Sequence, residues 1–153
     1  MLKLNVIALS HSTWASPVVV VPKKIGKARF CVDCRRLNDI STKVAYPLPR
    51  MGDCLESLGD AQMFTSLDST AGYWQVPLRK EDQETMAFNT HCVIYHWLST
   101  PFGFTNAPAT FQRSLDISLS GLKWQLCLVY LNDVIIFSTK AKQLVKDIDT
   151  VLH

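Results

Sequence analysis

The sequence predicts an α+β fold in which antiparallel strands form a sheet that is backed by helices. Two pairs of extended segments carry the strands: residues 18–21 with 29–32, and residues 126–131 with 134–137. Each pair is separated by a short polar turn, which is typical of a β-hairpin. Apolar residues with helical spacing follow positions 106 and 140, and these two stripes predict helices.

The composition fits one domain of ordinary size. With 153 residues and a hydrophobic content of 48%, the chain can bury a sizeable core. Its four Trp, four Tyr and seven Phe argue against a disordered chain. No apolar run approaches the ~18 residues of a membrane helix, and the stretch at 1–10 is too short for a secretory signal. We expect a soluble intracellular protein with no membrane partner; cytoplasm and nucleus both stay open.

The net charge of +3 is unevenly divided along the chain. Residues 1–50 carry nine Lys/Arg against two acids (+7), and residues 51–153 carry seven against eleven (−4). A basic segment beside a mildly acidic one suits a polyanion that is held in one region while chemistry occurs in another. A solvated basic face is the alternative.

The cysteines form no disulfide framework, because their number is odd. Cys31 and Cys34 are spaced as C-x-x-C, but no second pair completes the four ligands of a structural zinc site. Both lie in a strand-like stretch, where residues three apart point to opposite faces. We expect reduced core thiols rather than a metal site. The five cysteines are Cys31, Cys34, Cys54, Cys92 and Cys127.

The first half of the chain begins with a hairpin over 18–32 whose tip, 23–27, is cationic. An extended segment ends at residues 47–49. A short helix follows, with Met51, Leu55 and Leu58 on one stripe and Gly59 suited to end it.

The middle of the chain predicts strands separated by turns. Residues 64–68 indicate a strand that is broken at Ala71-Gly72, and an extended pattern continues over 73–78. Residues 81–84 predict a turn or a single helical turn, and residues 85–98 predict two short strands.

The last third predicts two helices around a hairpin. After a loop at 101–108, Asn106 can cap a helix with Pro108 in its first turn. The apolar run 126–131 and its partner 134–137 leave Asn132-Asp133 as the hairpin tip. The apolar stripes of the two helices are Phe111, Leu115 and Leu119, and Leu144, Ile148, Val151 and Leu152.

Two acids, Asp68 and Asp133, stand at strand ends in apolar surroundings. Each alone has an ordinary explanation, because Asn-Asp is a common hairpin tip and acids often end strands. The pair gains meaning if the two strands are neighbours in one sheet. Carboxylates that meet there would repel unless a cation such as Mg²⁺ lay between them.

Taken in order, segments along nearly the whole chain resemble the reverse transcriptase domain of gypsy-like LTR retrotransposons. Each match is short, but the ordered set is specific. The last three groups below resemble polymerase motifs A, B and C. The matching segments are Trp14 to Val19, Arg29 to Asp33 with Arg35 to Asn38, Tyr46 to Arg50, Leu67-Asp68 with Gly72 to Gln75, Pro101 to Phe104 with Asn106 to Gln112, and Val129 to Asp133.

The resemblance implies a right-hand polymerase: a palm of antiparallel strands backed by helices, with a fingers hairpin. It implies one domain, with residues 1–50 in the fingers and residues 51–153 in the palm together with some fingers strands. The thumb, connection and RNase H regions of the Pol polyprotein, like its integrase, lie outside the matched segment. The implied activity is RNA-directed DNA synthesis with two Mg²⁺ or Mn²⁺ ions. The implied partners are an RNA template, a DNA primer or RNA–DNA hybrid, and dNTPs.

The resemblance also implies roles for single residues. Asp68 and Asp133 match metal ligands, and Asn132 occupies the position of a third. The dNTP site would include Arg29, with Lys23 or Lys24, Tyr73, Phe102 and Gly103; Tyr130, Gln112 and Arg113 would contact primer or template. Ordinary alternatives remain, since the two lysines could be solvated turn residues and Tyr73 a core tyrosine. Gln112 and Arg113 could be exposed helix residues.

Asn132 is a departure from the family pattern, which reads Tyr-x-Asp-Asp where this chain reads Tyr130-Leu131-Asn132-Asp133. An amide oxygen can bind Mg²⁺ but brings no charge. We expect a loss of roughly 10²–10⁴-fold in rate. Two further hypotheses follow: a non-catalytic nucleic-acid-binding remnant, or a decayed copy without function.

Overall fold

The computed structural model describes residues 1–22, 26 and 28–153, which form two compact units. The first unit comprises Met1–Val44 and Tyr73–Ala107, and the second comprises Ala45–Gly72 and Pro108–His153. Lys23 and Lys24, in the predicted cationic tip, lie outside the described residues. Among the residues that are described, no helix is long and apolar enough to cross a membrane.

The first unit is built on a five-stranded sheet with the order β1-β6-β5-β2-β3. The predicted hairpin is confirmed, because β2 and β3 pair antiparallel with Val18 opposite Val32. All neighbouring strands are antiparallel except β2 and β5, which run parallel. The strands are β1 (Ile7–Leu9), β2 (Ser16–Pro22), β3 (Ala28–Val32), β5 (Ala87–Asn89) and β6 (Ile94–Trp97).

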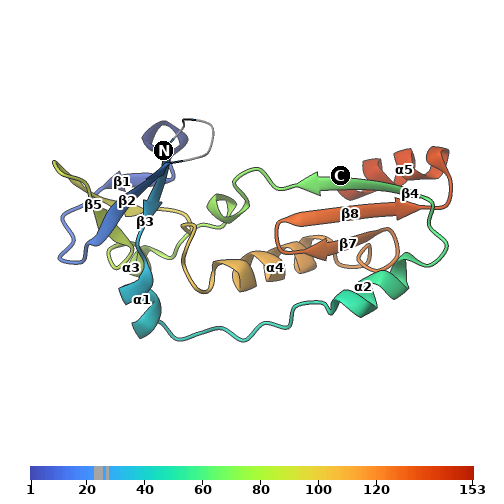
Figure 1. Ribbon diagram of the computed structural model, residues 1–153, viewed down its shortest axis with the longest axis horizontal. Coiled ribbons are helices and arrows are strands. Elements are labelled where there is room, and N and C mark those ends of the chain that lie inside the picture. Colours follow the sequence, from blue (N-terminus) through green and yellow to red (C-terminus); the bar gives the residue numbers. More distant parts are fainter. Residues whose placement is uncertain (23–25, 27) are drawn as a thin grey trace. The chain divides into compact units, whose positions relative to one another are not determined.

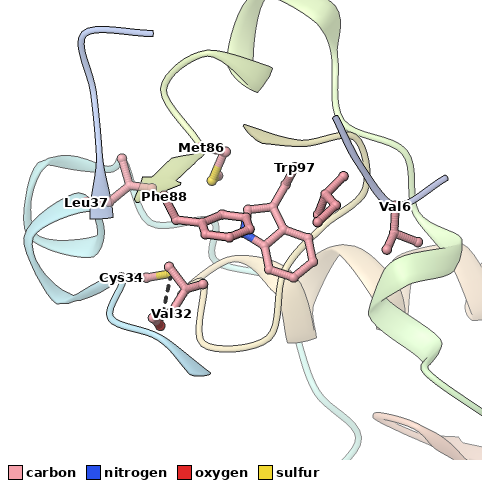
Figure 2. Packing of buried hydrophobic residues seen from close by; sticks show 8 residues of the cluster. Val6, Val32, Cys34, Leu37, Met86, Phe88 and Trp97 are labelled. Atoms are coloured by element: carbon pink, nitrogen blue, oxygen red, sulfur yellow. Dashed lines mark hydrogen bonds between the residues drawn. The ribbon is translucent and has the colours of Figure 1, made fainter. Parts of the chain in front are cut away.

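Aromatic residues dominate the core of the first unit. The rings of Phe88 and Trp97, which are 1% and 4% exposed, lie 5.4 Å apart between centroids. Figure 2 shows them at the centre of a cluster that also contains Val6, Val32, Cys34, Leu37 and Met86. The helical elements of this unit are η1 (Leu2–Leu4), α1 (Arg35–Ile40) and α3 (Lys80–Gln83), with η2 (Gly72–Gln75) at its boundary.

The second unit holds a three-stranded antiparallel sheet with helices packed against it. Its strands, β4 (Met63–Asp68), β8 (Asp133–Ser138) and β7 (Cys127–Tyr130), lie in that order, with β8 in the middle (Figure 1). The helices are α2 (Met51–Leu58), α4 (Ala107–Ser118) and α5 (Ala141–Leu152). Side chains of α4 and α5 pack against Cys127, Val129, Val134 and Ile136 of the central and edge strands.

Some local expectations were wrong. The extended pattern predicted over 73–78 begins instead as the 3-10 helix η2, because Ala71 takes a left-handed φ of 53° and redirects the chain. Asn106 directly precedes α4, and its side-chain oxygen binds the segment before α2. That oxygen accepts a hydrogen bond from the Val44 N–H at 3.0 Å, and the amide nitrogen donates to the Thr42 carbonyl at 2.9 Å.

Some apolar helix residues that were predicted to be buried are exposed. On α2, Met51 and Leu55 are exposed, whereas Cys54 is buried. On α5, Leu152 is exposed, although the other three predicted residues pack against the sheet. Cys34 lies after β3, at the start of α1, and so outside the predicted strand.

Candidate active site

Asp68 and Asp133 are direct partners in the β4–β8 ladder. Asp68 ends β4 and Asp133 begins β8, so both lie at one end of the sheet, and both are exposed. Directly opposed residues on antiparallel strands have Cβ atoms about 4.5–5.5 Å apart, and like charges there destabilise the pair. The structure therefore brings together the two acids whose proximity the sequence could not establish.

The hairpin turn is displaced by one residue from the prediction. Tyr130 pairs with Asp133, so the two-residue loop is Leu131-Asn132 and not Asn132-Asp133. The residue with positive φ is Leu131, at 54°. Asp133 consequently belongs to β8, where it pairs with Asp68 on β4 and with Tyr130 on β7.

The side chain of Asn132 lies against the loop that follows β4. Its Oδ1 is buried and has no hydrogen-bond partner among the described residues. The same oxygen lies 3.3 Å from the point where a Cβ on Gly72 would stand. The loop also binds the Asn132 backbone, since the Ser69 N–H donates to the Asn132 carbonyl at 3.0 Å. Asn132 is thus held by both its backbone and its side-chain environment.

The donor set fits a divalent cation only in part. Two carboxylates and an amide oxygen are the hard oxygen ligands that Mg²⁺ prefers. However, no group of three or more His, Cys, Asp or Glu that could hold a metal ion occurs in the described part of the chain. At position 132 the chain has a neutral amide, where the resemblance implies a third acid.

Gln112 lies behind the turn and is fully buried, at 0% exposure. The expectation of an exposed helix residue is therefore wrong for Gln112, although it holds for Arg113. The Gln112 Oε1 accepts a hydrogen bond from the Leu131 N–H at 2.7 Å. Its Nε2 donates to the Val129 carbonyl at 3.2 Å and to the Asp116 carboxylate at 3.0 Å. Its polar atoms are thus engaged by the protein itself.

Asp116 was not singled out from the sequence. It accepts hydrogen bonds from the Lys123 Nζ at 2.6 Å and the Tyr46 hydroxyl at 2.8 Å, besides Gln112. Burial raises the pKa of its carboxyl, but these three hydrogen bonds outweigh burial and hold the pKa below the usual value. Only the i,i+4 spacing of Gln112 and Asp116 on a helix could have suggested the pair.

The predicted dNTP residues that the structure describes belong to the first unit, and the acids belong to the second. Arg29 is exposed on β3. The rings of Tyr73 and Phe102 lie 5.0 Å apart between centroids, and Tyr73 is half-buried. Gly103 has a φ of 92°, and its carbonyl accepts a hydrogen bond from the Asn38 Nδ2 at 2.8 Å. Of the predicted primer contacts, Tyr130 is exposed at the end of β7.

These features define the class: an α+β right-hand polymerase fold, with an acid pair on the palm sheet. The reverse transcriptase (RNA-dependent DNA polymerase) family matches residues 21–153. The chain is 41% identical over 156 residues to the retrovirus-related Pol polyprotein from transposon 297 of Drosophila melanogaster, covering 99% of this chain and 15% of that protein. For the Pol polyprotein from transposon gypsy of the same species, the identity is 39% over 158 residues, with the same coverage of 99% and 15%.

Solved structures of reverse transcriptases have a similar fold. The crystal structure of prototype foamy virus protease-reverse transcriptase is similar with a TM-score of 0.83 and 26% identity, over 98% of this chain and 20% of that one. The foamy viral enzyme in complex with dsDNA gives 0.82 and 25%, over 98% and 31%. The chain belongs to the reverse transcriptase family, and the relatives it matches are retrotransposon Pol polyproteins. It spans about 15% of their length.

Proposed function

We propose that this chain is the fingers and palm part of an RNA-directed DNA polymerase that works within a longer Pol polyprotein. The single observation that carries the proposal is the opposition of Asp68 and Asp133 on neighbouring strands. In this assignment the first unit supplies the fingers and the second the palm. The reaction joins the 3′-hydroxyl of a DNA primer to the α-phosphate of a dNTP, and pyrophosphate leaves.

Asp68 and Asp133 would hold the divalent ions, Mg²⁺ or Mn²⁺, with the Asn132 amide as a weak third donor. When bound, a pair of such ions stabilises the attacking and leaving oxygens of the phosphoryl transfer. Two carboxylates supply a charge of −2 against +4 from two ions, so we expect weak binding of at least one ion. Loss of the third carboxylate lowers the rate by roughly 10²–10⁴-fold.

Substrate roles in the proposal fall to residues of the first unit. Arg29 is exposed, and a guanidinium can engage a triphosphate through two donors at once. Tyr73 and Phe102 form one aromatic contact, which suits a wall of the dNTP pocket, with Gly103 allowing close backbone approach. An RNA template with a DNA primer is the proposed partner; a solved relative is a complex with dsDNA.

Primer extension on poly(rA)/oligo(dT) with Mg²⁺ or Mn²⁺ tests the proposal. The chain should extend the primer very weakly, and Asn132→Asp should extend it faster. Asp68→Asn in the Asn132→Asp background should abolish the gain. Asn5→Asp, at an exposed asparagine of the first unit, is the matched control for added charge. Equal extension by the original chain and Asn132→Asp would refute the role of Asn132.

Binding of nucleic acid without catalysis is the second candidate, and Asn132 favours it. Residues 1–50 carry a net charge of +7, nine Lys/Arg less two acids, which suits phosphate contacts. Salt-sensitive binding of an RNA–DNA duplex without primer extension would support this candidate. A chain without a cooperative unfolding transition would instead support the decayed copy.

A further inference from the structure

The turn of the β7–β8 hairpin contains a residue in a strained backbone conformation. Leu131, its first residue, has a φ of 54°, a region that glycine occupies readily and leucine rarely. Strained conformations of this kind persist where the surroundings impose them. The Leu131 N–H donates to the buried Gln112 Oε1 at 2.7 Å. A side chain of α4 therefore supports the strained residue.

The orientation of the Gln112 amide follows from its partners. In the observed orientation, Oε1 faces the Leu131 N–H, and Nε2 faces the Val129 carbonyl and the Asp116 carboxylate. The reverse orientation would set the amide NH₂ against an N–H, and its oxygen against a carbonyl and a carboxylate. One amide thus bridges Val129, on β7, and Leu131, in the turn.

Asp116 in turn fixes the amide. Its carboxylate accepts from Gln112, from Lys123 in the segment after α4, and from Tyr46 in the segment before α2. The ion pair with Lys123 is largely sheltered, since the two side chains are 16% and 15% exposed. Charge-assisted hydrogen bonds of this kind are stronger than neutral ones. Three separate segments therefore meet at the Asp116 carboxylate, and Gln112 connects this carboxylate to the turn.

We propose that Gln112 and Asp116 are positioning residues for the candidate metal centre. Asp116 orients the Gln112 amide, and the amide holds the Leu131-Asn132 turn in its strained shape. The turn then presents Asp133 at the position opposite Asp68. The effect on metal binding rests on the proposed function; the effect on the turn does not.

Amide hydrogen exchange, read residue by residue by NMR, tests the effect on the turn. Gln112→Met keeps the buried volume but removes the acceptor for the Leu131 N–H. Exchange of the Leu131 amide should accelerate about tenfold relative to the slowest amides of β8, as expected for loss of one hydrogen bond. Ser114→Ala is the matched control, because it removes a hydrogen bond to Thr110 within the same helix. Its Leu131 amide should exchange at the original relative rate.

A charge-preserving exchange of partners provides the second test. Asp116→Asn should also accelerate Leu131 exchange, because it weakens the bonds that orient the amide. In the double variant Gln112→Glu with Asp116→Asn, a carboxylate accepts the Leu131 N–H and the amide at position 116 donates to that carboxylate, while the Val129 carbonyl loses its donor from position 112. We expect this pair to restore Leu131 protection at least in part. Unchanged Leu131 exchange in Gln112→Met, or equal acceleration across the whole hairpin, would overturn the proposal.

Mn²⁺ titration by electron paramagnetic resonance connects the turn to the metal centre. In the Asn132→Asp background, Gln112→Met should weaken Mn²⁺ binding about tenfold, and Ser114→Ala should not. If Asn132→Asp binds no Mn²⁺ while Leu131 exchange responds as expected, the proposed function fails and the support of the turn stands. If Mn²⁺ binds with equal affinity with and without Gln112, the positioning role is wrong.

Discussion

Asp68 and Asp133 stand directly opposite each other in the β4–β8 ladder, one ending its strand and the other beginning its own. Neither residue is distinctive by itself. Their opposition places two negative charges at one end of the sheet, where like-charged partners repel. A cation held between them would turn this repulsion into attraction. Asn132, in the adjoining turn, lacks the third charge that would strengthen such a site.

Asn132→Asp should make the stability of the chain depend on divalent ions. Without metal, a third carboxylate beside the pair should lower stability by up to about 1 kcal/mol, or roughly 2–4 °C in Tm. Saturating Mn²⁺ should raise the Tm of the variant above that of the original chain in Mn²⁺. Thermal unfolding followed by circular dichroism, with and without Mn²⁺, measures both effects. A Tm that is insensitive to Mn²⁺ in both proteins would argue against a metal centre.

Gly72→Ala should disturb the support of Asn132. A Cβ at this position would lie 2.8 Å from Phe111 Cζ and 3.0 Å from its Cε1, besides 3.3 Å from Asn132 Oδ1. Because Phe111 is only 3% exposed, its ring has little room to move away. We expect destabilisation of about 1–3 kcal/mol in urea unfolding.

The matched control for that change is Gly52→Ala, within α2, where a Cβ would meet nothing within 4 Å. It should stabilise the chain by about 0.5–1 kcal/mol, because alanine restricts the unfolded chain and favours the helix. Equal effects of the two substitutions would contradict the packing of Gly72 against Phe111.

Local patterns in the sequence were sufficient to predict the hairpins and most helices. The turn register was missed because asparagine tolerates positive φ, so the sequence favoured Asn132-Asp133 as the loop. The observed register puts the strained φ on Leu131, where a hydrogen bond from 19 residues away supports it. No local pattern around Leu131 reports that contact.

The candidate metal site also depends on contacts between residues that are distant in the sequence. The acids Asp68 and Asp133 could be suspected from their strand ends and from the family resemblance, but their opposition depends on the pairing of distant strands. Gln112 looked like an exposed helix residue because polar side chains usually face water. Its burial is explained by the backbone groups of Val129 and Leu131 and the Asp116 carboxylate, with which it forms hydrogen bonds.

Cys34 should resist alkylation. Burial, helped by the negative charge of Asp33, raises the pKa of its thiol to about 11. At pH 8 only about one molecule in a thousand then carries the reactive thiolate, so modification should be roughly a hundredfold slower than for an ordinary cysteine. Mass spectrometry after timed treatment with iodoacetamide measures the rate, with the exposed Cys92 as the internal reference. Comparable labelling of both in the native chain, rather than only in urea, would contradict the burial of Cys34.

Asp116 should make the second unit sensitive to acid. Its folded-state pKa lies below the ordinary value, so the folded chain binds fewer protons there than the unfolded chain. The stabilisation is therefore present above the unfolded pKa of about 3.9, and it is lost as the pH falls through the lower folded value. Asp116→Asn should cost about 2 kcal/mol near neutral pH, because hydrogen bonds to a charged group are weakened. The difference in Tm from the original chain should shrink below about pH 4.

Asp60→Asn, at an exposed position, is the control for this prediction and should leave the Tm nearly unchanged at every pH. A difference between Asp116→Asn and the original chain that stays constant from neutral to acidic pH would show that the carboxylate charge is not what stabilises this network.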